Sequence, residues 1–339
     1  MKNTGEFLRM TLRTVVGLSL AAIVFALASS QILVAAPAQA GKAPATPAPS
    51  SPSKKTSSSS QKTFSSPKAA AEALISAAAR YDVPELTEIL GPDGIDLVVS
   101  EDAVQSRNIA GDFARKAREK LSVAADPRNA GRMILTIGDE DYPSAIPIVR
   151  AAKGWRFDAK AGRQEILYRR IGGNELDAIK FCRGYVEAQF EYASKKRDGA
   201  RVNQYAQRVI ATAGKQDGLA WKTADGKWEG PVGENVAQFI TEGYSDKSKP
   251  FHGYFFKVLK GQGPAAPLGQ MDFVVKDVMI GGFALVAAPA EYRVTGVKTF
   301  IVSHDGVVYE KDLGPKTLEV FGAMERFNPD KTWGPVETP

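Results

Sequence analysis

The stretch RQEILYRRIGGNELDAIKFCRGYVEAQFEYASKK, from Arg163 to Lys196, predicts one long helix in the middle of the chain. Its apolar side chains recur at mostly three- and four-residue steps, which is the spacing of one helix face. Those positions are Ile171, Ala178, Ile179, Cys182, Val186, Phe190 and Ala193. The helix is expected to end before Asp198-Gly199, because glycine readily adopts the left-handed conformation that closes a helix.

Downstream of this helix, short apolar runs predict strands over 251–259, 282–287, 298–303 and 307–311. Asp305-Gly306, between the last two runs, is a strong hairpin signal, because both residues tolerate the positive φ angles of a two-residue turn. Residues 200–244 read as irregular, with one short helix near 202–211. A final short helix is expected over 316–327.

Upstream of the long helix, three helices are predicted to precede a set of strands. Ser66 followed by Pro67 starts the first, because serine caps a helix and proline fits its first turn. The expected helices cover 67–80, 84–90 and 102–121, and the expected strands 133–137, 145–150 and 154–158. Pro147 limits the middle strand to a sheet edge, because proline cannot donate a ladder hydrogen bond.

This order of elements predicts an α+β fold with two domains. Residues 62–160 are expected to form helices plus a curved antiparallel sheet. Residues 161–336 are expected to form the long helix plus a second antiparallel sheet.

The first 40 residues have the three parts of a signal peptide. Lys2 and Arg13 belong to a basic start, an apolar run covers 15–36, and Ala38-Gln39-Ala40 is a small-x-small cleavage site. Cleavage before Gly41 predicts a periplasmic or secreted protein that meets the membrane only through its signal peptide. A retained anchor is the alternative, because about 20 apolar residues span a bilayer.

Residues 41–61 are rich in Pro, Ser, Ala, Thr and Lys, which predicts a disordered linker. The single cysteine, Cys182, excludes both an internal disulfide and the lipid-bearing cysteine of a lipoprotein. One cysteine and two histidines cannot complete a Cys/His metal site. The net charge of +6 falls to +4 without the signal peptide, which is too mild for a nucleic-acid surface, so no nucleic-acid partner is expected.

Several strings resemble an uncharacterised family of exported bacterial proteins, the domain of unknown function 2950. They include RIGGNE at 170–175, AQFEYA at 188–193, FHGYFFK at 251–257, GGFALVA at 281–287 and TFIVSHDGVVY at 299–309. The resemblance covers nearly all of 62–336. It implies an exported protein of unknown activity and brings no catalytic residues with it.

Two further resemblances lie inside this one. Residues 64–160 resemble the cone-shaped sheet of the nuclear-transport-factor-2-like (NTF2-like) superfamily. Residues 165–313 resemble the periplasmic part of type II pseudopilins, in which a helix with an Asn-Glu and then an Ala-Gln-x-x-Tyr pattern precedes an antiparallel sheet. Asn174-Glu175 and the run 188–192 match that pattern. In pseudopilins the apolar assembly helix directly precedes this one, whereas here a whole domain separates them.

His252 and Tyr254 are the candidate functional pair, because alternate residues of a strand share one face and His/Tyr pairs can do acid–base work. No acidic partner stands at diagnostic spacing from them. His304, beside Asp305-Gly306, is expected to help form a turn. Cys182 is expected to be a buried apolar residue and not a reactive thiol.

The remaining acidic candidates have structural interpretations. The run Asp139-Glu140-Asp141 lacks the alternating ligands of an EF-hand and reads as a solvated loop. Asp158, at a strand end, is the one plausible acid for a cavity in the first domain, although a turn is its simpler role. No nucleophile elbow, phosphate loop or HExxH motif is present in the sequence.

We therefore expect a non-catalytic binding or interaction protein of the cell envelope, without catalytic, cofactor or metal residues, whose partner is a protein or envelope component. One alternative is a small-molecule binder or envelope enzyme that uses a cavity of the first domain. A second alternative is an accessory subunit of a secretion or pilus-like system. A polar cavity would favour the first alternative, whereas a cavity filled by Leu, Ile and Phe would favour the interaction protein.

Overall fold

The computed structural model describes residues 61–100, 103–233 and 250–337. The predicted signal peptide and nearly all of the predicted linker lie outside these residues. The described chain divides into an N-terminal unit, 61–166, and a C-terminal unit, 167–337. The division falls within helix α5 (Ala159–Ala193), close to the expected boundary at 160/161. Helices combined with antiparallel sheets confirm the α+β class.

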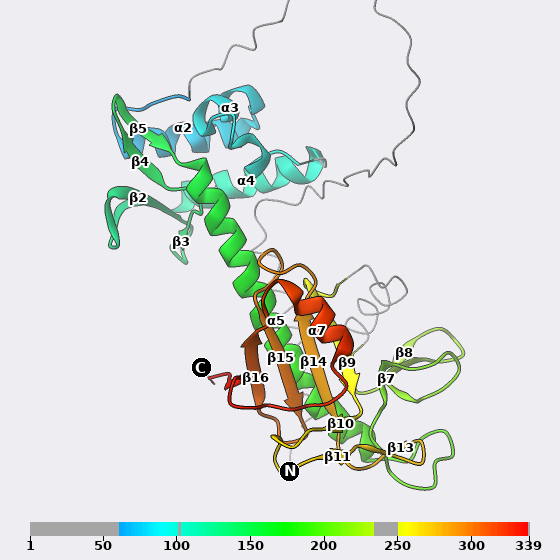
Figure 1. Cartoon of the computed structure of the whole chain (residues 1–339). Helices are drawn as coiled ribbons and strands as arrows, with labels where there is room; N and C mark the ends of the chain where they lie inside the picture. The colour runs from blue at the N-terminus through cyan, green and yellow to red at the C-terminus, as the bar shows by residue number, and fades with distance from the viewer. Residues whose placement is uncertain (1–60, 101–102, 234–249, 338–339) are drawn as a thin grey trace, which may run out of the picture. The chain divides into compact units, whose positions relative to one another are not determined.

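The N-terminal unit packs helices on a five-stranded antiparallel sheet (Figure 1). Its helices are α2 (Pro67–Arg80), α3 (Val83–Leu90), η1 (Ile95–Leu97) and α4 (Ala103–Glu119). Its strands are β1 (Leu121–Asp126), β2 (Asn129–Ile137), β3 (Tyr142–Pro143), β4 (Ile148–Ala151) and β5 (Gly154–Phe157). The order is β1-β2-β4-β5, with β3 also paired to β2. Leu135, Ile148 and Phe157 are fully buried in one cluster with apolar residues of α2, α3 and α4.

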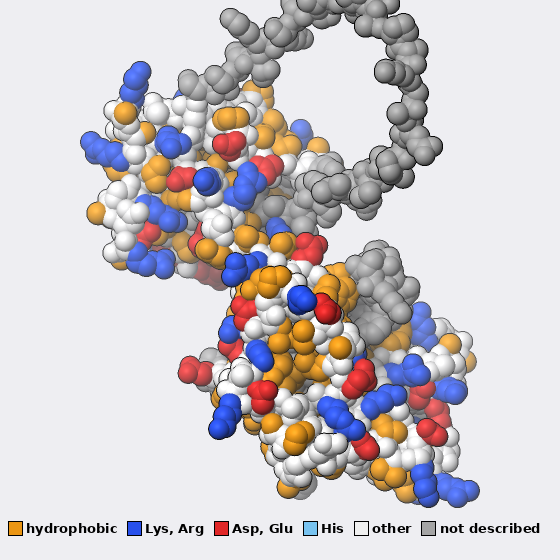
Figure 2. Space-filling model, viewed as in Figure 1, with side chains coloured by type: hydrophobic (Ala, Val, Ile, Leu, Met, Phe, Trp, Pro, Cys, Tyr) orange, Lys and Arg blue, Asp and Glu red, His pale blue; other side chains and the backbone are white. Residues whose placement is uncertain are grey.

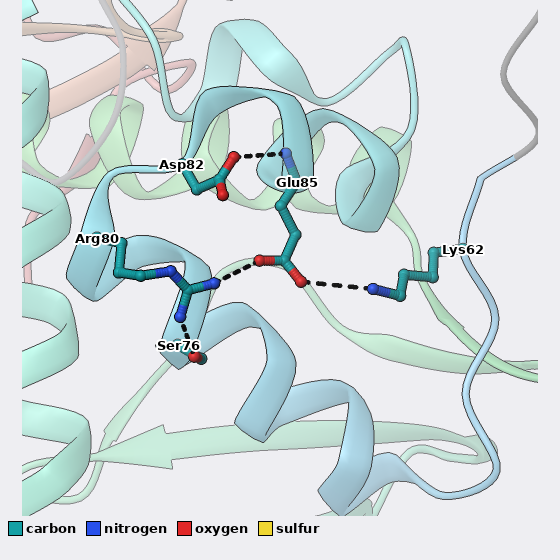
Figure 3. A network of polar contacts seen from close by, with 5 residues as sticks. All are labelled: Lys62, Ser76, Arg80, Asp82 and Glu85. Carbon is teal, nitrogen blue, oxygen red and sulfur yellow. Dashed lines mark hydrogen bonds and ion pairs between the residues drawn. The ribbon is translucent and has the colours of Figure 1, made fainter.

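Local chemistry explains how α2 and α3 begin and how they are joined. Ser66 Oγ accepts from Ala69 N (3.1 Å) at the start of α2, and Asp82 Oδ1 accepts from Glu85 N (3.1 Å) at the start of α3. Both are N-caps, which satisfy backbone donors that the first helical turn leaves free. Figure 3 shows the Glu85 carboxylate between Arg80 (2.6 Å) and Lys62 (3.4 Å). This exposed network connects α2, α3 and the segment before α2.

Two features of this unit differ from the expectations. The helix expected over 102–121 ends at Glu119, and Leu121–Asp126 is a strand that was not expected, paired with β2 along the register Leu121↔Ile137 to Ala125↔Met133. The strand after Pro147 is internal and not at an edge, since β4 pairs with both β2 and β5. Proline is tolerated there because β4 begins one residue later, so its missing N–H lies outside the ladder.

The segment before α2 is held against β5. Phe64 and Trp155 exchange both backbone hydrogen bonds (2.8 Å each), and the Gln61 side chain donates to Phe157 O (2.8 Å). Gly154 has φ 128°, and a Cβ there would lie 2.3 Å from Phe64 O. The close pairing therefore requires glycine. Gln61, assigned to the linker from the sequence, belongs to the folded unit.

The C-terminal unit is built on a five-stranded antiparallel sheet of order β17-β16-β15-β14-β9. These strands are β9 (Tyr254–Leu259), β14 (Ala284–Pro289), β15 (Lys298–Ser303), β16 (Val308–Asp312) and β17 (Gly334–Pro335). The short helices η2 (Gly314–Lys316) and α7 (Thr317–Ala323) follow β16. The predicted hairpin at Asp305-Gly306 is confirmed, with Gly306 at φ 78°.

Helices cover both faces of this sheet. Phe256 of β9 packs on Phe181 of α5 (ring centroids 4.1 Å), whereas its neighbour Lys257 donates to Gly322 O of α7 (2.9 Å). Successive strand residues point to opposite faces, so α5 and α7 lie on opposite sides (Figure 1). All six residues of β14 are accordingly buried.

Smaller sheets extend the unit beyond its main sheet. β6 (Arg208–Ile210), β7 (Gly218–Lys222) and β8 (Trp228–Glu229) form a three-stranded sheet, in which β6 and β7 are parallel. Two short hairpins pair β10 (Gly261–Gln262) with β11 (Met271–Asp272) and β12 (Val274–Val275) with β13 (Val278–Met279). The helix expected near 202–211 is therefore wrong, since β6 occupies its end. None of the described helices has the length and apolar character needed to cross a bilayer.

The buried face of α5 differs from the predicted stripe. Its core positions are Ala178, Cys182, Tyr185, Val186, Ala188, Gln189 and Tyr192. Phe190, expected in the core, is 49% exposed. Tyr185 and Tyr192 lie on the buried face, and their hydroxyls donate to Ala284 O (3.4 Å) and Gln216 O (2.5 Å).

Candidate functional site

The proposed His252–Tyr254 pair is not assembled. β9 begins at Tyr254, and His252 lies in the turn before it with φ 45°. Phe251 and Tyr254 close this turn by exchanging backbone hydrogen bonds (2.9 and 3.0 Å). Two positive-φ residues, His252 and Gly253, form its tip, so His252 leaves the strand register and does not share a face with Tyr254.

Tyr254 has a structural role. Its side chain is buried, and its hydroxyl donates to Lys298 O (2.8 Å). Burial raises the pKa of Tyr254 far above its ordinary value. A Cβ at Gly296 would lie 2.2 Å from the hydroxyl, so glycine there lets the ring reach β15.

His252 has an acidic partner that its sequence neighbourhood did not reveal. Its Nδ1 lies 2.7 Å from Asp177 Oδ2, on α5, 75 residues earlier. Burial of Asp177 raises its pKa, but the hydrogen bond and charge of His252 and the charge of Lys180 outweigh this, so the pKa lies below its ordinary value. The pair joins the turn before β9 to α5.

Replacement of Asp177 by asparagine is expected to weaken the C-terminal unit in a pH-dependent way. The folded-state pKa of Asp177 is depressed, so its stabilisation is present above the unfolded pKa of about 3.8. That stabilisation is lost as the pH falls through the folded value. We expect a loss of about 0.5–1 kcal/mol at pH 6, limited by solvent screening at the half-exposed His252, and almost none at pH 2.

Urea unfolding at both pH values measures this difference. Glu191→Gln, at an exposed position of the same helix, is the control and should behave alike at both pH values. An Asp177→Asn deficit that persists undiminished at pH 2 would contradict the charge-based account.

The Asn-Glu pair of the long helix clamps the loop before β15. Asn174 Nδ2 donates to Thr295 O (2.8 Å). Glu175 Oε1 accepts from Val297 N (2.8 Å) and Lys298 N (3.0 Å). Both side chains therefore satisfy backbone groups of one distant loop.

The side chains of the Ala-Gln-x-x-Tyr pattern bind backbone groups of the segment after the helix. Buried Gln189 donates to Ala206 O and accepts from Ala206 N, both at 2.8 Å. Tyr192 donates its hydroxyl to Gln216 O (2.5 Å). The polar residues that carry the resemblance on α5 thus hold loops in place.

The other candidate residues have structural roles. Cys182 is fully buried, and burial raises the pKa of its thiol to about 12. His304 lies in the β15–β16 turn against Phe273 and Phe283. Asp158 Oδ1 accepts from Ala161 N (3.0 Å) and caps α5. Asp141 pairs with Lys120 (2.7 Å). Within the described ranges, no three His, Cys, Asp or Glu side chains are grouped to hold a metal ion.

A cleft of about 720 Å³ lies beside the β6–β7–β8 sheet and is the strongest candidate site. We call it the tryptophan cleft. Its lining consists of Asp198, Ala211, Thr212, Ala213, Gly214, Lys215, Gln216, Trp221, Lys222, Thr223, Ala224 and Trp228. Its volume falls within the range of about 300–1,000 Å³ that is common for small-molecule sites.

The two tryptophans differ in exposure. Trp221 is 7% exposed, and Arg197 lies over its ring at 4.8 Å and over Tyr192 at 4.7 Å. Trp228 is partly exposed and pairs across the strands with Lys222, whose Nζ lies 5.1 Å from the ring centroid. Trp221 therefore supplies a buried wall, and Trp228 an accessible aromatic face.

Basic side chains outnumber free acidic ones around the cleft. Figure 2 shows Lys and Arg side chains over β7 and β8, with acidic side chains among them. Among the acidic residues near the cleft in sequence, Asp217 lies 3.6 Å from Arg208, and Asp225 lies 2.9 Å from Lys227. Asp198 accepts from Gln216 N (2.6 Å). Each of the three carboxylates is therefore already engaged.

Sequence reasoning missed this cleft, because it lies in the region interpreted as irregular. One signal was available: Asp225-Gly226 lies between two short runs that each contain a tryptophan, which is the pattern of a hairpin. The parallel pairing of β6 with β7 and the approach of Arg197 depend on tertiary contacts, and no local pattern indicates them.

The chain matches the model of a family described as protein of unknown function (DUF2950) over residues 61–336 of its 339 residues. The chain belongs to this family. The DUF2950 match begins at the first described residue and extends through both units, which confirms the family expected from the sequence. No curated protein and no solved structure matches the chain.

Proposed function

We propose that this DUF2950 protein is an exported, non-catalytic binding protein of the cell envelope whose ligand occupies the tryptophan cleft. The cleft itself carries the proposal. It combines an accessible aromatic face, a buried aromatic wall and lysines with no carboxylate partner among the described residues, in about 720 Å³. Convergent polar groups around apolar rings are typical of ligand sites. The signal-peptide pattern that ends at Ala38-Gln39-Ala40 supports export.

A non-catalytic role is supported by the structural roles of the side chains that could otherwise do chemistry. Asn174, Glu175 and Gln189 bind backbone groups, and the Cys182 thiol is buried. An envelope enzyme is the second candidate, and the His252–Asp177 pair favours it, because an oriented imidazole is what a general base requires. Among the described residues, however, no serine, threonine or cysteine side chain hydrogen-bonds to His252 as a nucleophile would.

The finer fold assignments remain part of this proposal. An NTF2-like N-terminal unit is supported by helices packed on an antiparallel sheet. A pilin-like C-terminal unit is supported by the long helix α5 against the second sheet. A ligand inside the N-terminal unit has less support, because Leu135, Ile148 and Phe157 fill the space between its sheet and helices. A role in a secretion or pilus-like system rests on the pilin-like likeness alone.

Trp228→Ala is expected to reduce binding to envelope material at least tenfold, because it removes the accessible aromatic face of the cleft. The exported chain is purified, its N-terminus is sequenced, and co-sedimentation with isolated membranes and insoluble wall material is measured. The N-terminus should begin at or near Gly41.

Trp333→Ala is the matched control, since Trp333 also has a lysine over its ring but lies outside the cleft. It should bind as the wild type does. Equal binding by folded Trp228→Ala and wild-type chains would refute the cleft as the binding site, and an N-terminus at Met1 would refute the processed, exported form.

A further inference from the structure

We propose, building on the function proposed above, that the ligand of the tryptophan cleft is an acidic saccharide, whose sugar rings carry carboxylates. The inference starts from two cations that line the cleft, Lys215 and Lys222, and from Arg197, which lies over the ring of the lining residue Trp221. Among the residues that the structure describes, none of the three has a carboxylate partner within ion-pair distance. The charges of the two lining lysines are therefore available to a ligand, and they favour a negatively charged one.

The aromatic surfaces select a ligand with ring faces. A sugar ring presents C–H groups on its faces and hydroxyl oxygens at its edges, so it packs on an indole while its edge meets polar groups. Trp228 offers the partly exposed indole, and Lys222 lies beside it at 5.1 Å. A carboxylate at the edge of a sugar stacked on Trp228 would meet the Lys222 ammonium group.

Hydrogen-bond donors at the cleft lack acceptors. The indole Nε1 of Trp221 and the guanidinium Nε of Arg197 are buried and have no hydrogen-bond partner among the described residues. A buried donor without an acceptor costs about 1–3 kcal/mol. The two donors belong to side chains that stack on each other. A ligand that satisfies these two donors must carry oxygen acceptors.

Gln216 and Thr223 show which polar groups of the cleft remain free for a ligand. Gln216 lines the cleft, and Asp198 and Tyr192 occupy its backbone N–H and C=O. No partner of its side-chain amide is found in the described part of the chain. Thr223 Oγ1, by contrast, already donates to Asp225. The free polar groups of the cleft are thus mainly donors and cations, which complement hydroxyl and carboxylate oxygens.

Titration of the full exported chain with tetragalacturonate and with the matching neutral tetragalactose tests the proposal. Intrinsic tryptophan fluorescence and calorimetry give the dissociation constants. We expect the acidic oligosaccharide to bind at least tenfold more tightly, with an affinity that falls as the salt concentration rises. Citrate and benzoate serve as probes for charge alone and for an aromatic acid.

Lys222→Gln should weaken tetragalacturonate binding about five- to tenfold and leave tetragalactose unchanged. Lys227→Gln is the matched control, because Lys227 lies on the same hairpin but is paired with Asp225 at 2.9 Å. Lys227→Gln should change neither constant. Circular dichroism checks that each variant is folded.

Each contrary outcome has a distinct meaning. Equal binding of the acidic and neutral oligosaccharides, abolished by Trp228→Ala, would overturn the acidic ligand and leave the cleft as a binding site. Citrate or benzoate binding as tightly as tetragalacturonate would overturn the saccharide. If no oligosaccharide binds while envelope binding remains sensitive to Trp228→Ala, the ligand class is wrong and the proposed function stands. Saccharide binding that survives Trp228→Ala would place it outside the cleft.

Discussion

Phe283→Ala is expected to lower the free energy of unfolding of the C-terminal unit by about 3–5 kcal/mol. Phe283 is fully buried and lies within ring-contact distance of four aromatic side chains. Those contacts are with Tyr185, Phe190, Tyr205 and His304, at centroid distances of 5.7, 5.4, 4.8 and 6.2 Å. Truncation to alanine leaves a cavity that four rings, held by their own backbones, cannot collapse to fill.

Urea unfolding measured in a Trp155→Phe background isolates this effect. The chain has four tryptophans, and the other three lie in the C-terminal unit, so their fluorescence then follows that unit alone. Phe190→Ala is the control, because the ring of Phe190 touches the same cluster but is 49% exposed. It should cost only about 1 kcal/mol. Equal losses for the two variants would refute the assigned core.

Gln189→Ala is expected to cost the C-terminal unit about 3 kcal/mol. It removes the two hydrogen bonds to Ala206 and leaves the buried N–H and C=O of that residue without partners. Each unsatisfied buried group costs about 1–3 kcal/mol. Loss of the bond from Gln189 to the Tyr185 hydroxyl (2.8 Å) adds to this.

Urea unfolding measures the loss of stability. Amide hydrogen exchange at Ala206 tests the local effect and should be faster in the variant. Gln207→Ala provides the comparison, since the Gln207 amide also donates to a backbone carbonyl, Asp277 O (2.7 Å), but at an exposed site. We expect it to change the stability by no more than about 0.5 kcal/mol. A Gln189→Ala chain as stable as Gln207→Ala would show that the clamp does not hold the segment.

Phe190 and Gln189 are residues whose roles the sequence misjudged or left open. Phe190 fits the apolar spacing of α5, yet the helix buries Tyr185 and Tyr192 in its place. The polar Gln189 lies in the core because its amide matches both backbone groups of Ala206. Spacing along a helix identifies a face within about one residue, and the partners across the unit decide the rotation.

The α+β class, the main helices and seven of the seventeen described strands could be predicted from the sequence, because these depend on local periodicity, caps and turn residues. The family followed from the resemblance of whole sequence strings. It correctly placed Cys182 in the core and the turn at Asp305-Gly306. Each of those inferences needs only neighbours within a few positions. The His252–Asp177 pair spans 75 residues, so local spacing carried no sign of it.

Tertiary structure alone decided the site. The tryptophan cleft gathers the segment after α5, the loop before β7 and the β7–β8 hairpin. Arg197 reaches Trp221 only because α5 and β7 pack in one core. It also placed β4 between two strands despite Pro147, and it moved His252 out of the β9 register through two positive-φ residues. All these cases have one physical reason. They depend on contacts between backbone groups and rings that are far apart in the sequence, and only the complete fold brings those groups together.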